Sequence, residues 1–96
     1  MHDQMLIAPG MAVTIAAPDA AAEGGKKTLE RTVVGISPSR VRFDGDTLVD
    51  LQVFMRGDVT LRKNGRDYLY HKRETGSFCE REMHFLIFWE VPTNAF

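Results

Sequence analysis

Apolar and polar residues alternate over short stretches of this chain, and this alternation limits its fold more than any other feature. Residues 28–36, 40–43 and 82–91 follow a period of two, the spacing that gathers apolar side chains on one face of a β-strand. Two dipeptides, each placed between two short apolar segments, favour tight hairpins, because both turn residues need a positive φ: Asp44-Gly45 and Asn64-Gly65. The pattern predicts strands joined by short turns.

Ninety-six residues, of which 44% are hydrophobic and 26% charged, suit one globular domain over residues 1–96. About six strands and no long helix are expected. We therefore predict an all-β fold, a small single-domain antiparallel β-barrel. Residues 17–27 are rich in alanine and glycine and have no apolar stripe, so we expect a mobile loop there.

Residues 47–55 fit two patterns. As a strand, they would place four apolar residues on one face: Val49, Leu51, Val53 and Met55. As a helix, they would align Leu48, Leu51 and Met55, with Asp46 as the N-cap. The β-branched residues and the preceding hairpin favour the strand.

The Asn64-Gly65 turn sets a register for the segments on either side of it. The expected cross-strand pairs are Lys63–Arg66, Arg62–Asp67, Leu61–Tyr68 and Val59–Tyr70. Tyr68 and Tyr70 then share one face. Aromatic side chains with basic neighbours can stack unpaired bases, but the apolar partners of these two tyrosines favour a place in the core.

The sequence contains no pattern typical of a catalytic or cofactor site. Neither a G-x-S-x-G motif nor a phosphate-binding glycine loop occurs. The candidate metal ligands lack the close pairing of structural zinc sites: His2, His71, Cys79 and His84. Acidic neighbours at positions 80 and 82 disfavour a reactive thiolate at Cys79. We expect a protein without enzymatic activity, metal or cofactor.

Features of the chain that bear on its location favour the cytoplasm. The longest apolar run, residues 85–89, is far shorter than the roughly 20 residues that span a bilayer. Residues 1–5 lack the pattern of a secretory signal. A single cysteine allows no intrachain disulfide and suits a reducing compartment. We expect a cytoplasmic protein without membrane insertion.

Charge is unevenly distributed along a chain whose formal net charge is only −1. Residues 56–73 contain six basic and two acidic side chains. In the alternative function this segment, the basic hairpin, binds an anion, a nucleotide or nucleic acid through Arg62, Lys63, Arg66, Lys72 and Arg73. A general nucleic-acid binder is usually clearly basic, so the total charge disfavours a nucleic-acid partner.

Residues 82–91 form the most apolar of the expected strands, and the middle of this strand is apolar on both faces. Such a strand is either covered on both sides or meets a partner. We assign Leu86 and Phe88 to binding a protein partner or a second copy of the chain, and Phe88→Asp is then expected to abolish association. The expected function is that of a non-enzymatic adaptor or regulatory protein that acts through protein contacts.

One strand–turn–strand resembles part of the N-terminal barrel of the flagellar-brake (YcgR-type) proteins. Residues 32–44 share its apolar pair, its Ser-Pro turn and its alternating strand that ends in Asp. Further similarity follows in three segments: Gly57–Leu61, Tyr68–Tyr70 and Phe85–Pro92. The resemblance implies a barrel and a regulatory role in cyclic di-GMP signalling or motility.

In the flagellar-brake family a PilZ domain follows the barrel and binds cyclic di-GMP through R-x-x-x-R and D/N-x-S-x-x-G motifs. Arg62 and Arg66 have the first of these spacings, but they flank the Asn64-Gly65 turn, and no D/N-x-S-x-x-G follows them. The resemblance therefore does not imply nucleotide binding by this chain.

Overall fold

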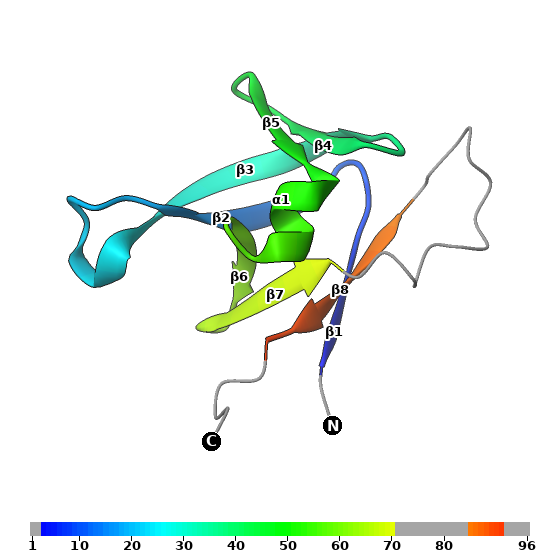
Figure 1. Cartoon of the computed structure of the whole chain (residues 1–96). Helices are drawn as coiled ribbons and strands as arrows, with labels where there is room; N and C mark the ends of the chain where they lie inside the picture. Colours follow the sequence, from blue (N-terminus) through cyan, green and yellow to red (C-terminus); the bar gives the residue numbers. More distant parts are fainter. Residues whose placement is uncertain (1–2, 71–84, 92–96) are drawn as a thin grey trace.

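The computed structural model describes residues 3–70 and 85–91, which form one antiparallel sheet and a short helix (Figure 1). The sheet has eight strands in the order β1-β8-β7-β6-β2-β3-β4-β5. The strands are β1 (Gln4–Ile7), β2 (Ala12–Pro18), β3 (Lys26–Ile36), β4 (Arg40–Phe43), β5 (Thr47–Asp50), β6 (Thr60–Lys63), β7 (Arg66–Tyr70) and β8 (Leu86–Glu90). Helix α1 spans Leu51–Arg56, and a 3-10 turn spans Glu23–Gly25.

The all-β antiparallel class expected from the alternation is confirmed, but the sheet is not closed and has eight strands rather than about six. β1 and β5 stand at the two ends of the strand order, and among the described residues no pairing joins them. β1 is only four residues long, too short for alternation to reveal it. Its partner β8 lies at the other end of the described sequence.

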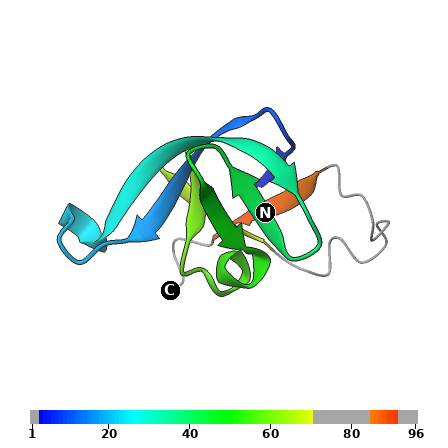
Figure 2. The same cartoon turned by 90° about the horizontal axis from the view of Figure 1, so that it is seen from above.

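A bend over residues 8–11 connects β1 to β2. Two hydrogen bonds attach this bend to β3: the N–H of Gly10 donates to the carbonyl of Val33 (2.8 Å), and the N–H of Val33 donates to the carbonyl of Met11 (2.8 Å). β1 and β2 follow one another in sequence, yet β8, β7 and β6 lie between them in the sheet. The strands therefore wrap around a shared interior, as the view from above shows (Figure 2).

The hairpin register predicted around Asn64-Gly65 is confirmed for its three inner pairs: Lys63–Arg66, Arg62–Asp67 and Leu61–Tyr68. Both turn residues have the positive φ that such a hairpin needs, 56° at Asn64 and 78° at Gly65. The fourth predicted pair lies outside the ladder, because β6 begins at Thr60, after Val59.

The predicted Asp44-Gly45 turn and the predicted loop over residues 17–27 both differ in length from the connections in the structure. Phe43 pairs with Thr47, so three residues rather than two connect β4 to β5. Between β2 and β3, the strands extend to Pro18 and from Lys26, and the connection is shorter than the expected loop over 17–27. The mobility of that loop stays a prediction.

Residues 47–56 combine both of the patterns that the sequence allowed. The segment begins as strand β5 and continues as helix α1 from Leu51. The strand prediction is therefore wrong beyond Asp50, because Leu51 and Phe54, three residues apart, are the side chains that α1 buries. Asp46 lies in the β4–β5 turn rather than at the N-cap, which is Asp50.

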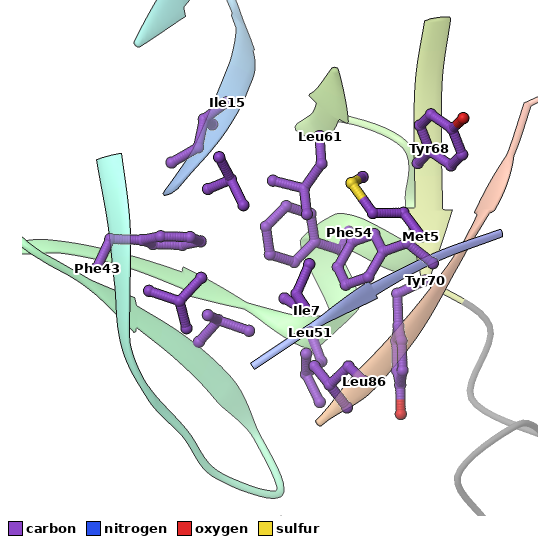
Figure 3. Packing of buried hydrophobic residues seen from close by; sticks show 14 residues of the cluster. Met5, Ile7, Ile15, Phe43, Leu51, Phe54, Leu61, Tyr68, Tyr70 and Leu86 are labelled. Atoms are coloured by element: carbon purple, nitrogen blue, oxygen red, sulfur yellow. The ribbon is translucent and has the colours of Figure 1, made fainter. Parts of the chain in front are cut away.

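The core lies between the curved sheet and α1, which contacts β4 and β5 on one side and β7 on the other. Figure 3 shows its side chains converging from both halves of the sheet. The ring of Phe54 meets that of Phe43 edge-on at a centroid distance of 6.5 Å and that of Phe88 at 5.0 Å. Tyr68 and Tyr70 are 1% and 3% exposed, which confirms their predicted place in the core.

Candidate interaction surface

Strand β8 contains the two residues assigned to partner binding from the sequence, Leu86 and Phe88. Neither side chain has any exposed surface, and the ring of Phe88 packs between Phe54 and Tyr70, at centroid distances of 5.0 and 5.9 Å. Binding a partner required both side chains to face outward, so this assignment is corrected: they form the core. Phe88→Asp would bury a carboxylate and unfold the domain, which makes it unsuitable as a test of association.

The opposite face of β8 and its two neighbours forms an apolar surface. Residues directly opposite one another on paired strands point to the same side of a sheet. Ile87 lies opposite Leu6 of β1, and Trp89 lies opposite Leu69 of β7. Leu6 is 49% exposed, and the other three are half-buried. We call these four residues the outer apolar face.

Exposed apolar side chains that gather on one face of a protein mark interaction sites, whereas scattered ones are ordinary. The pattern of residues 82–91, apolar on both faces at the middle of the strand, indicated that β8 has a second apolar face, but it did not show which face lies in the core. Sequence reasoning missed Leu6 because it did not assign a strand to residues 4–7. Only the pairing of β1 with β8 brings Leu6 beside Ile87.

Polar contacts hold these three strands together at one end. The hydroxyl of Tyr68 on β7 donates to Oδ2 of Asp3 (3.1 Å). The carboxylate of Glu90 on β8 accepts a hydrogen bond from the N–H of Asp3 (3.3 Å) and pairs with Nη1 of Arg66 (3.4 Å). Burial raises the pKa of Tyr68, and its hydrogen bond to Asp3 raises it further. The tyrosine therefore stays a neutral donor, and the outer apolar face rests on three linked strands.

In the basic hairpin, which carries the alternative site, Arg62 is paired with a carboxylate of the same hairpin. Nε and Nη2 of Arg62 lie 2.8 and 3.4 Å from the two oxygens of Asp67, and Nζ of Lys26 lies 3.6 Å from Oδ2 of Asp67. The hydrogen bond to Asp67 raises the pKa of Arg62 above its ordinary value. Arg62 therefore offers little free charge to an anion.

Two other arginines of this segment are also paired with carboxylates. Arg66 pairs with Glu90, as described above, and Arg56 pairs with Asp58 (3.0 Å). Lys63 is exposed and makes no ion pair with a described residue. The other two members of the predicted patch, Lys72 and Arg73, lie outside the described residues, so the structure does not place them relative to the hairpin.

The candidate metal ligands, among them the candidate nucleophile Cys79, also lie outside the described residues: His2, His71, Cys79 and His84. Within residues 3–70 and 85–91, no group of three or more His, Cys, Asp or Glu side chains could hold a metal ion. The geometry on which the metal and nucleophile hypotheses depend is therefore untested, and the outer apolar face is the candidate site that the described residues provide.

The chain matches no family model, and no curated protein or solved structure shows significant similarity to it. In the described part of the chain, no helix has the length and apolar character needed to cross a membrane.

Proposed function

We propose that this protein is a non-enzymatic cytoplasmic module that binds other proteins through the outer apolar face. The observation that carries this proposal is the 49% exposure of Leu6 next to half-buried Ile87, on strands whose other face is taken up by the core. A regulatory role in cyclic di-GMP signalling or motility remains what the resemblance to flagellar-brake barrels suggests.

Charge pairing supports protein contacts over the alternative of nucleic-acid binding. Affinity for nucleic acid comes largely from unpaired Lys and Arg side chains that replace counterions on phosphates. Three arginines of the basic hairpin already have carboxylate partners, namely Arg56, Arg62 and Arg66. A phosphate would have to displace these carboxylates, which reduces the gain in free energy from binding.

Photo-crosslinking in the cells that naturally make the protein tests this proposal. A benzophenone amino acid at Gln4, an exposed residue of β1 that lies opposite Trp89, should form protein adducts. The same probe at Gln52, also an exposed glutamine but on α1, is the matched control and should form few. Leu6→Lys should reduce the adducts at position 4, because a charge on the apolar face opposes burial.

Equal adducts at positions 4 and 52, or none at position 4, would contradict the proposal. The nucleic-acid alternative has its own readout. If binding to single-stranded DNA is salt-sensitive and weakens when Arg62, Lys63 and Arg66 are neutralised, the basic hairpin is the functional surface instead.

A further inference from the structure

We propose that the partner on the outer apolar face is a second copy of this chain, which pairs its own β1 with β1 in antiparallel orientation around a two-fold axis at Leu6. This inference rests on the proposed function and names its partner. The juxtaposition behind it is a strand edge, Gln4–Ile7, that no described residue pairs with, next to the outer apolar face.

The backbone of β1 has hydrogen-bonding groups available on its outer edge. In the described part of the chain β1 has a neighbour on one side only, which is β8. The N–H of Glu90 donates to the carbonyl of Asp3 (2.9 Å). In an antiparallel ladder, the backbone N–H and carbonyl of every second residue bond to the neighbouring strand, and those of the residues in between point away from it. Counting from Asp3, the N–H and carbonyl of Gln4 and Leu6 are directed toward the open edge.

The two edges of the sheet differ in how they are protected against pairing. Charged side chains on an edge strand normally prevent it from pairing with a strand of another chain. β5, at the far end, contains Asp50 in an ion pair with Arg40 (3.6 Å). The four residues of β1 are Gln, Met, Leu and Ile, with no charge and no proline. β1 is therefore the edge that accepts another strand.

A two-fold axis at Leu6 suits the pattern of β1. Each Leu6 would lie opposite Leu6 of the second copy on the outer face, and Met5 would lie opposite Ile7 of the second copy on the core side. The two outer apolar faces would then adjoin, with Ile87 flanking the axis on each side. In this register the nearest charges, the two copies of Asp3, are separated by six residues, or about 20 Å along the strand, so like charges do not oppose pairing.

Backbone hydrogen bonds between the two strands also add binding free energy that burial of the side chains alone does not provide. Leu6 is already half covered, so burying the rest of it contributes only about 1 kcal/mol. Association costs at least about 4 kcal/mol in lost translational and rotational freedom. A partner that adds hydrogen bonds along the edge is therefore favoured over one that only covers the face.

Disulfide trapping at Leu6 tests the axis directly. In a background where the only cysteine is removed, Cys79→Ser, Leu6→Cys would bring two thiols together across a hydrogen-bonded pair with Cα atoms about 5.5 Å apart. Leu48→Cys is the matched control, since Leu48 is 52% exposed on the other edge strand. We expect the Leu6→Cys chain to form disulfide dimers about tenfold faster, because pairing raises the effective thiol concentration.

The mass in solution provides the second measurement. Light scattering should give about twice the 10.8 kDa of one chain for the wild type at high concentration. Leu6→Lys should give the monomer mass with an unchanged circular dichroism spectrum, and Leu48→Lys should leave the dimer intact. A wild type that is monomeric at every concentration, or equal trapping at positions 6 and 48, would overturn the second copy as the partner.

The photo-crosslinks at Gln4 separate failure of this inference from failure of the proposed function. Adducts of twice the chain mass support the second copy. If the wild type is monomeric and the adducts contain a different protein, the inference fails and the proposed function stands. If position 4 forms no adducts at all, both fail.

Discussion

At the scale of single residues, Asp67 shows how two cations stabilise one carboxylate. Nε of Arg62 lies 2.8 Å from Oδ1 of Asp67, and Nζ of Lys26 lies 3.6 Å from Oδ2. Burial by itself raises the pKa of Asp67, but the hydrogen bond and charge of Arg62, together with Lys26, outweigh it and hold this pKa below its ordinary value. The ionised form therefore stabilises the fold above the unfolded-state pKa of about 3.9. This contribution is lost as pH falls through the lower folded-state pKa.

Asp67→Asn should lower the free energy of unfolding by about 1 kcal/mol at neutral pH, a modest value because the pair is partly exposed. The difference from wild type should shrink in acid as pH falls through the lowered folded-state pKa of Asp67, where the wild-type carboxyl becomes protonated too. Urea denaturation at neutral pH and at a series of acidic pH values measures it. Asp58→Asn is the control and should cost less, because Asp58 and Arg56 are both more than half exposed. A difference that persists unchanged in acid would contradict the electrostatic explanation.

At the scale of elements, the end of α1 depends on one glycine. Gly57 has a φ of 86°, in the left-handed region, and its N–H donates to the carbonyl of Val53 (3.1 Å). A Cβ at this position would lie 3.2 Å from Cδ2 of Leu69. Gly57 therefore ends the helix and lets β7 approach it closely, which also positions one residue of the outer apolar face.

Gly57→Ala should destabilise the fold by more than Gly65→Ala. Both glycines have a positive φ, so each substitution should cost about 1 kcal/mol of backbone strain. At Gly65 an added Cβ meets open space, whereas at Gly57 it crowds Leu69. Thermal unfolding followed by circular dichroism measures the difference. Equal losses of stability in the two variants would show that crowding against Leu69 is unimportant.

At the scale of the whole molecule, Phe54 joins parts of the fold that the sheet order keeps apart. Its ring contacts Phe43 of β4 and Phe88 of β8, and these strands lie near opposite ends of the sheet. The side chain has no exposed surface. Because the sheet is open, this packing between its two halves takes the place of the hydrogen bonds that would close a barrel.

Phe54→Ala should therefore lower the free energy of unfolding by about 3–5 kcal/mol, a large part of the roughly 5–15 kcal/mol typical of a domain. Met55→Ala, one residue further along α1, removes a side chain that is 38% exposed and should cost much less. Urea denaturation of both variants provides the comparison. Similar losses at positions 54 and 55 would mean that α1 does not hold the two halves together.

Local pattern was enough to predict several parts of this structure. The Asn64-Gly65 hairpin, its register from residue 61 to residue 68 and the core position of both tyrosines all follow from neighbouring residues. Alternation likewise indicated the antiparallel class and showed that β8 has two apolar faces. In each case the deciding contact joins residues close in sequence, so the spacing of residue types carries the information.

The features that local pattern did not predict depend on pairing between strands that lie far apart in the sequence. Whether Leu86 and Phe88 or Ile87 and Trp89 face the core depends on how β8 pairs with β1 and β7, and the residues of β8 are apolar on both faces. The helix at residues 51–56 forms because Phe54 has aromatic partners on β4 and β8, which a local pattern does not reveal. The edge position of β1, and with it the exposure of Leu6, exists only once the ends of the described chain meet in one sheet. The alternation thus determined what the strands are, and the tertiary structure determined which of their faces are left for a partner.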